Sequence, residues 1–136
     1  MSTRSNIFVD FDGERKQFYH HYDGYLDGVG ADLLVKLRSV TEKVFSESSC
    51  YDNLERKVYE EFLKTLKADK EYEPEEIGLH GGIEYLYYVK INERGVADEI
   101  SFTETSWEKL GDEKYMEALE KAECGEHKIS LVVKVG

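Results

Sequence analysis

Cysteine, proline and tryptophan are scarce in this chain, with two, one and one of them among 136 residues. Cys50 and Cys124 lie far apart, and neither belongs to a Cys-x-x-Cys pair, which excludes a zinc ribbon. Isolated thiols of this kind are expected to stay reduced in the cytoplasm. We therefore expect a fold that is held by a buried core rather than by disulfides or structural zinc.

Long hydrophobic runs are also missing. No stretch approaches the roughly 20 consecutive apolar residues that a membrane-spanning helix needs. Residues 1–6 lack the apolar segment of a secretory signal peptide. With 40% hydrophobic and 35% charged residues, the composition is that of a folded globular chain. We expect a single domain over residues 1–136, in the cytoplasm and without a membrane partner.

Positive charge is in short supply, because 18 lysines and arginines face 29 aspartates and glutamates, for a formal net charge of −11. A surface of this sign repels phosphate backbones, so we expect no nucleic-acid partner. It suits a basic protein partner, although acidity that serves only solubility is common. The motifs Walker A, Gly-x-Ser-x-Gly, His-Glu-x-x-His and Gly-x-Gly-x-x-Gly are absent. No enzyme class is indicated, and we expect neither a cofactor nor a metal.

Hydropathy patterns predict the secondary structure. Alternating apolar residues predict strands over residues 6–11, 17–22, 83–91, 97–103 and 129–135. Apolar residues at helical spacing predict helices over residues 31–45, 52–67 and 112–122. The acidic segment around Pro74 is predicted to be a linker. The order ββααββαβ favours an α+β fold of two layers, a mainly antiparallel sheet with helices packed on one face.

The second face of the strand over 83–91 carries Leu86 and Tyr88. We expect the third helix or a second copy of the chain to cover these side chains. Self-association as a homo-oligomer is therefore left open.

One stretch, Tyr19–Gly30, concentrates aromatic, imidazole, carboxylate and glycine residues between the predicted hairpin and the first helix. His21 and Asp23 would share a face if the strand continued, and they are suited to metal binding or to general-base chemistry. The glycines permit close ligand approach, and the amides of a helix N-terminus attract anions. A tight glycine-built connection between strand and helix explains the same residues. The candidate ligand-binding residues are Tyr19, His21, Asp23, Gly24, Tyr25, Gly28, Gly30 and His80.

His80 precedes the strand over 83–91 and stands next to two glycines. It joins the candidate site only if the fold brings it close to His21 and Asp23. A hydrogen-bonded loop histidine is the competing interpretation.

The segment Ile7–Gly13 is a hydrophobic strand that ends in Asp10-x-Asp12, and it resembles the first motif of haloacid-dehalogenase-like phosphatases. The resemblance implies that Asp10 is a nucleophile and Asp12 a general acid, with magnesium between them. Glu14 stands where threonine or valine is usual, and the next predicted element is a strand. A hairpin with an Asp-Gly turn is the simpler interpretation.

Two blocks carry a second family resemblance. The stretch Tyr19–Gly30 is similar to the pattern Tyr-(Arg/His)-His-Trp-Asp-Gly-Tyr-Pro-x-Gly-x-Gly of a group of small uncharacterised bacterial and phage proteins. The block His80–Tyr87 resembles that group's pattern His-Gly-Asp-Ile-Glu-Tyr-x-Tyr. The departures are Tyr22 for tryptophan, Leu26 for proline and Gly82 for aspartate. No activity is established for the group, so the resemblance implies none for this chain. It does imply a bacterial or mobile-element origin.

These observations favour a non-enzymatic binding or accessory protein that acts on a basic protein partner. The alternative is a small-ligand or metal-binding protein that uses His21, Asp23 and Tyr25 together with His80. A third, weaker interpretation is a phosphatase-like enzyme that uses Asp10 and Asp12.

Overall fold

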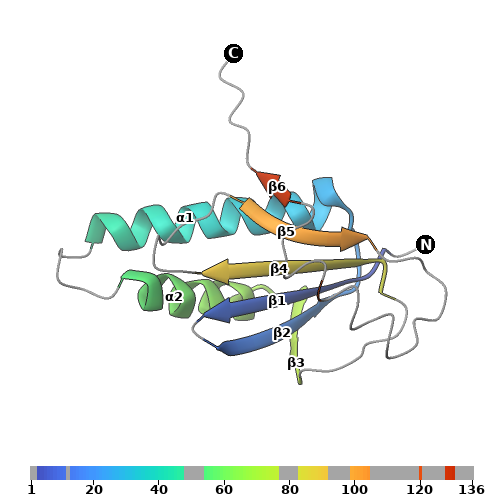
Figure 1. The fold of residues 1–136 in the computed structure, drawn as a ribbon, viewed down its shortest axis with the longest axis horizontal. Coiled ribbons are helices and arrows are strands. Elements are labelled where there is room, and N and C mark those ends of the chain that lie inside the picture. The colour runs from blue at the N-terminus through green and yellow to red at the C-terminus, as the bar shows by residue number, and fades with distance from the viewer. Residues whose placement is uncertain are drawn as a thin grey trace, which may run out of the picture.

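The computed structural model describes residues 3–11, 13–47, 54–76, 83–91, 99–104, 120 and 128–130 (Figure 1). Within these residues the strands form one sheet in the order β3-β2-β1-β4-β5-β6. The strands are β1 (Ser5–Phe11), β2 (Glu14–His20), β3 (Tyr72–Glu75), β4 (Tyr85–Ile91), β5 (Glu99–Glu104) and β6 (Lys128–Ser130). The helices are α1 (Ala31–Glu47) and α2 (Leu54–Ala68), and a short π-helical turn, η1 (Leu26–Gly30), precedes α1.

The predicted α+β fold is confirmed. The sheet is mixed and mainly antiparallel, because β1 and β4 run parallel while the other described neighbours pair antiparallel. Parallel strands need a long crossover connection, and here that connection contains both helices. The two helices pack against the sheet and cover its core (Figure 1).

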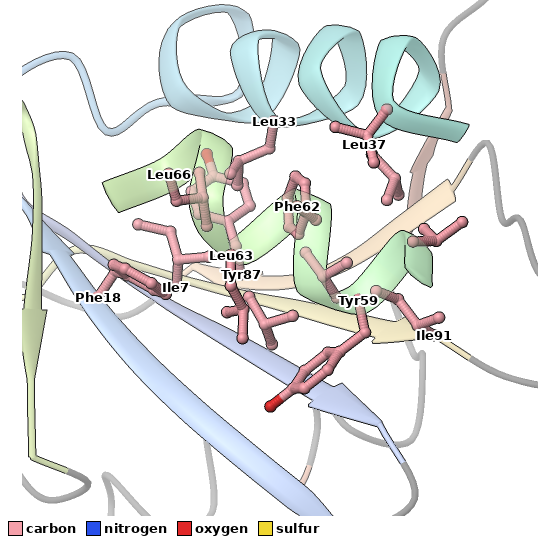
Figure 2. Packing of buried hydrophobic residues seen from close by; sticks show 14 of the residues in the cluster. Ile7, Phe18, Leu33, Leu37, Tyr59, Phe62, Leu63, Leu66, Tyr87 and Ile91 are labelled. Carbon is pink, nitrogen blue, oxygen red and sulfur yellow. The ribbon is translucent and has the colours of Figure 1, made fainter. Parts of the chain in front are cut away.

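The main core lies between the helices and one sheet face. Residues of β1 that face the helices stand beside β4 in parallel register, Ile7 opposite Tyr87 and Val9 opposite Val89. Figure 2 shows side chains of both helices meeting this face, and those fully shielded from solvent include Leu33, Val58, Phe62 and Leu66. Each such side chain contributes about 1.5–3 kcal/mol on burial, against about 0–1 kcal/mol for an exposed ion pair. Apolar packing therefore holds the helices to the sheet.

The predicted helices over 31–45 and 52–67 correspond to α1 and α2. Their buried residues recur at helical spacing, as the sequence predicted. Phe45 is an exception, because it was placed on the apolar face and is 47% exposed. Asp52, the expected first residue of the second helix, lies outside the described residues. So does the predicted third helix over 112–122, apart from Glu120, which is helical.

The opposite sheet face carries a smaller buried cluster, which consists of Phe8, Tyr19, Ile83, Leu86 and Tyr88. Leu86 is 0% and Tyr88 2% exposed in the single chain. Their burial therefore does not require a second copy.

The acidic linker predicted around Pro74 is wrong, since residues 72–75 form β3. This strand lies at one edge of the described sheet, with Pro74 opposite Phe18 of β2. Proline donates no backbone hydrogen bond, and sheets tolerate it at edges for that reason. The amide of Tyr72, at the start of the strand, donates its hydrogen bond to the Asp69 carbonyl at 3.0 Å. The strand was not predicted because its glutamates give one polar side and no alternating apolar pattern.

Candidate functional site

Strand β2 ends at His20, so the first two residues of the candidate stretch Tyr19–Gly30 belong to the strand. Asp23 then takes a left-handed backbone conformation, with φ of 53°. Aspartate and asparagine are among the few residues other than glycine that adopt this conformation readily. The chain turns out of the sheet here and enters η1. The continued strand that would have put His21 and Asp23 on one face does not form.

Backbone hydrogen bonds fix the loop between β2 and η1. The Gly24 amide donates to the Thr3 carbonyl at 2.9 Å, and the Val29 amide donates to the Asp23 carbonyl at 2.8 Å. The buried Tyr87 hydroxyl donates to the Gly24 carbonyl at 2.6 Å. The Gly28 and Gly30 amides, which the sequence offered as anion ligands, donate to the Tyr25 carbonyl at 3.0 and 3.4 Å. These groups hold the loop rather than facing an open site.

Two of the candidate glycines are required by close packing. A Cβ atom on Gly28 would lie 2.1 Å from the Asp23 carbonyl oxygen, and one on Gly24 would lie 2.7 Å from the Thr3 carbonyl oxygen. Both contacts are with backbone atoms, which cannot move aside as the end of a flexible side chain can. The glycines are explained by the shape of the loop itself.

The two sequence blocks converge on the start of β1. The Gly24 amide binds Thr3, and the Glu84 amide donates to the Arg4 carbonyl at 2.9 Å. Ile83 packs in the same buried cluster as Tyr19. The residues that lead into β4 thus lie against the segment that anchors the loop. His80 itself lies outside the described residues, so the condition that it lies close to His21 and Asp23 is not tested.

Tyr19 and His21 form a structural pair at the end of β2. The hydroxyl of Tyr19 lies 2.7 Å from Nδ1 of His21. Burial is the main reason why the pKa of Tyr19 is raised, which keeps its hydroxyl protonated. The contact with the hydroxyl of Tyr19 occupies Nδ1 of His21. The His21 ring also meets the Tyr22 ring edge-on, with centroids 4.5 Å apart.

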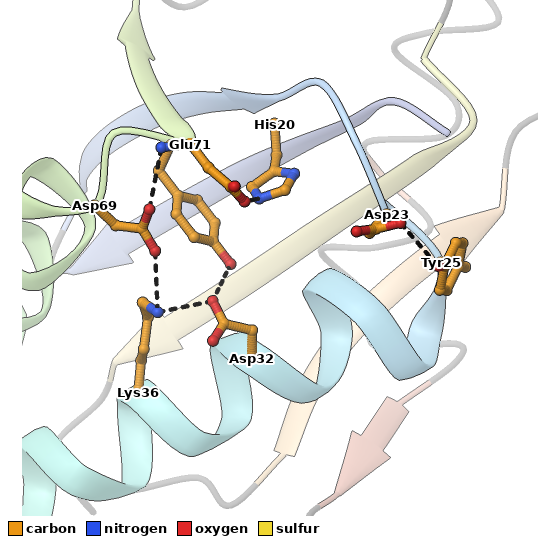
Figure 3. A network of polar contacts seen from close by, with 8 residues as sticks. His20, Asp23, Tyr25, Asp32, Lys36, Asp69 and Glu71 are labelled. Carbon is orange, nitrogen blue, oxygen red and sulfur yellow. Dashed lines mark hydrogen bonds and ion pairs between the residues drawn. The ribbon is translucent and has the colours of Figure 1, made fainter. Parts of the chain in front are cut away.

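The tip of the loop presents its side chains to solvent. Tyr22 is 59% and Tyr25 40% exposed, and Asp23 and Asp27 are also exposed. The Tyr25 hydroxyl donates to Oδ1 of Asp23 at 2.8 Å. Figure 3 shows this pair separated from the polar contacts around Lys36. Tyr22 and Asp27 were left out of the candidate residues. The predicted strand over 17–22 had placed Tyr22 on a sheet face, and the early end of β2 exposes it instead.

A second polar network, which the sequence analysis missed, joins α1 to β3. Nζ of Lys36 lies 2.8 Å from Oδ2 of Asp32 and 3.2 Å from Oδ2 of Asp69. The Tyr72 hydroxyl donates to the same Asp32 oxygen at 2.7 Å (Figure 3). Partial burial lowers the pKa of Lys36, but the bonds to both aspartates outweigh it and the pKa is raised. The i to i+4 spacing of Asp32 and Lys36 was the one signal of this network in the sequence.

His20 lies at the edge of this network on the side that faces the helices. Its Nε2 is 3.3 Å from Oε2 of Glu71, and its ring meets the Tyr72 ring edge-on at 4.7 Å between centroids (Figure 3). Nδ1 of His20 is buried without a hydrogen-bond partner, as is the hydroxyl of Ser5 on the neighbouring strand. Both residues are too deeply buried to meet a substrate.

The carboxylate of Asp10 is bound by side chains of two other strands. It lies on the sheet face away from the helices, where it accepts a short hydrogen bond from the Tyr88 hydroxyl. A guanidinium nitrogen of Arg15 lies 3.5 Å from the same carboxylate. Asp12, its partner in the phosphatase-like interpretation, lies outside the described residues. Among the residues that the structure describes, no three histidine, cysteine or acidic side chains are grouped to hold a metal ion.

Comparisons of the chain with protein-family models, with curated proteins and with solved structures gave no match. The resemblance of Tyr19–Gly30 to the bacterial and phage group therefore stays a prediction from the sequence. In the described part of the chain, no helix is long and apolar enough to cross a membrane.

Proposed function

We propose that the protein is a non-enzymatic binding protein that docks a basic protein partner on residues 21–27, named here the docking loop. The supporting observation is the contrast between the backbone and the side chains of this loop. Hydrogen bonds from Gly24, Val29 and Tyr87 fix the backbone. The side chains of Tyr22, Asp23, Tyr25 and Asp27 are exposed to solvent, whereas Leu26 packs against the core. The fold explains the glycines and the backbone of Asp23, and it leaves the exposed rings and carboxylates for another role.

Exposed tyrosines on a fixed loop suit protein recognition. Tyrosine is enriched among the residues that dominate binding energy, because it combines a large apolar ring with a polar hydroxyl. Tyr22 and Tyr25 are two of the four large hydrophobic side chains that are exposed among the described residues. A loop that is already fixed loses little conformational entropy when a partner binds. The docking loop therefore offers a preorganised aromatic surface.

The sign of the charge selects the class of partner. Asp23 and Asp27 lie on either side of Tyr25 in the sequence, Asp23 also follows Tyr22, and the whole chain carries a formal net charge of −11. Such a field accelerates the approach of a positively charged partner and repels acidic ones. The attraction is screened over about 8 Å at physiological ionic strength, so binding should weaken as salt is added.

The small-ligand alternative receives less support. Nδ1 of His21 is already bonded to Tyr19. We therefore favour a surface that binds a macromolecule over a site for a small molecule.

Affinity capture from the native host tests the proposal, with three immobilised forms of the protein. These are the wild type, the double variant Tyr22→Ala/Tyr25→Ala and the matched control Val35→Ala/Phe45→Ala. The control removes two apolar side chains of α1 that are 54% and 47% exposed. We expect the wild type and the control to retain a basic protein that salt elutes, and the loop variant to lose it. The captured protein is then purified and titrated directly. Equal retention by all three forms, or retention by none, contradicts the proposal.

A further inference from the structure

Three hydrogen bonds join a tyrosine hydroxyl to an aspartate within the described residues. They are Tyr88 to Asp10, Tyr72 to Asp32 and Tyr25 to Asp23. The first lies on the sheet face away from the helices and the second lies between α1 and β3. The third lies at the tip of the docking loop.

A cationic side chain accompanies each of the first two pairs. The guanidinium carbon of Arg15 lies 5.3 Å from the ring centroid of Tyr88, and one of its nitrogens lies 3.5 Å from Asp10. Nζ of Lys36 lies 5.5 Å from the ring centroid of Tyr72 and 2.8 Å from Asp32. Each cation therefore contacts the face of the ring and the carboxylate together.

This arrangement has a simple electrostatic basis. The face of an aromatic ring is the negative end of its quadrupole and attracts a cation within about 6 Å. The aspartate that accepts the tyrosine hydroxyl adds a full negative charge beside the ring. The hydrogen bond also fixes the relative position of ring and carboxylate, so one cation is able to reach both. A paired tyrosine and aspartate thus form a bidentate receptor for a positive side chain.

The Tyr25 and Asp23 pair differs from the other two. No lysine or arginine occurs between Lys16 and Lys36 in the sequence. Among the residues that the structure describes, none places a cation on Tyr25 or Asp23, and both side chains face solvent. Asp27 adds a second exposed carboxylate four residues from Asp23. The loop has the ring and the carboxylate of the other pairs but lacks their cation.

We infer that the pair formed by Tyr25 and Asp23 receives an arginine side chain of the basic protein partner. The inference rests on the proposed function and specifies one contact within it. Arginine is favoured over lysine because its planar guanidinium is weakly hydrated, stacks on aromatic rings and matches carboxylate geometry. The compact ammonium of lysine holds its water more strongly, which weakens its contact at an exposed site.

Peptide titrations followed by NMR test this inference. The probes are two capped Gly-Ser peptides, one with three arginines and one with three lysines at the same positions. The variant Asp23→Asn removes the charge and keeps a residue that tolerates φ of 53°. Asp27→Asn is the matched control, because it removes the same charge from the same loop. Tyr25→Leu removes the ring at an exposed position and serves as a second variant.

We expect the arginine peptide to bind the wild type, with the largest shifts in the docking loop. Asp23→Asn and Tyr25→Leu should each weaken it about fivefold, the size expected for a solvent-exposed cation–π or ion-pair contact. Asp27→Asn should weaken it less than twofold, on the order of a long-range charge effect. The lysine peptide should bind more weakly than the arginine peptide.

Two results overturn the inference while leaving the proposed function intact. They are equal losses in Asp23→Asn and Asp27→Asn, and equal affinities for the arginine and lysine peptides. Shifts that lie outside the docking loop contradict the proposed function as well. The two levels of the proposal are therefore distinguished by the same titration.

Discussion

Tyr25 donates its hydroxyl to the Asp23 carboxylate at 2.8 Å, although both side chains face solvent. The bond orients an exposed ring and an exposed charge relative to each other without adding to the buried core. Asp23 is able to hold this position because its left-handed backbone, at φ of 53°, turns the chain out of β2. The proposed docking loop depends on this local geometry.

The first prediction concerns the acidity of Tyr25. The hydrogen bond to Asp23 and the charge of Asp23 favour the neutral phenol, so the pKa of Tyr25 is raised above its ordinary value. Asp23→Asn should lower the pKa of Tyr25, because it removes the charge that opposes the phenolate. Asp27→Asn should lower it less, since Asp27 has the weakest of the recorded effects. A ¹³C NMR titration of the tyrosine ring carbons measures both shifts, and an unchanged value in Asp23→Asn would show that the bond does not form.

Gly28→Ala should destabilise the fold. The added Cβ would lie 2.1 Å from the Asp23 carbonyl oxygen, so the loop must shift. Overpacking of this kind typically lowers the free energy of unfolding by about 1–3 kcal/mol. Gly13→Ala is a useful comparison, because Gly13 has φ of 83° and no atom within 4 Å of an added Cβ. Its cost should be about 1–2 kcal/mol from backbone strain alone. Urea unfolding of both variants gives the values, and a wild-type-like Gly28→Ala would refute the described loop.

Tyr72→Phe should weaken the connection between α1 and β3. The variant removes the hydrogen bond to Asp32 but leaves Lys36 on that carboxylate. We expect a loss of about 1–2 kcal/mol in the free energy of unfolding, as for a partly buried bond to a charged group. Tyr25→Phe removes the same type of bond at an exposed position and should leave the stability near that of the wild type. Equal effects of the two variants in chemical denaturation would contradict the structural role of Tyr72.

Stability should fall in alkaline solution. Burial is the main cause of the raised pKa values of Tyr72, Tyr87 and Tyr88. A tyrosine whose pKa in the folded state exceeds the unfolded value of about 10 makes its full contribution to stability at pH values below 10. The contribution declines as the pH rises above 10 toward the folded pKa, because the unfolded chain releases its protons first. The urea midpoint should therefore drop between about pH 9 and 11. Full tyrosinate absorbance with an intact circular dichroism spectrum would exclude this linkage.

The spacing of apolar residues in the sequence was sufficient to predict much of the fold. Ile7, Val9 and Phe11 alternate with polar and aromatic neighbours, and the spacing of Val58, Phe62 and Leu66 is that of a helix face. These patterns reflect burial on one side of an element, which is why the first hairpin and both helices were predicted. Strand β3 was not predicted, because its outer position and its single proline give a strand without an apolar pattern.

The candidate site was located by composition and misjudged in its geometry. Gly24 and Gly28 were predicted to serve close approach, and the approaching groups are carbonyls of the chain itself. The left-handed conformation of Asp23 is accompanied by two backbone hydrogen bonds, from Gly24 to Thr3 and from Val29 to Asp23. The sequence pattern indicates neither of these bonds. Tyr22 was predicted to lie on a strand, and its exposure follows from the end of β2 at His20. Contacts within the loop, together with the bond from Gly24 to Thr3, determine its geometry, and the spacing of residue types does not reveal them.

Chemical-shift mapping of the ¹⁵N-labelled protein with the captured basic partner tests the docking loop most directly. We expect the amide signals of residues 21–27 to shift or broaden first, and increasing salt to reverse the change. Signals of Val35 and Phe45, which are exposed on α1 to a similar extent as the loop tyrosines, should stay in place. Shifts that centre on α1 or on the edge strand β3, with the loop signals unchanged, would contradict the proposed function.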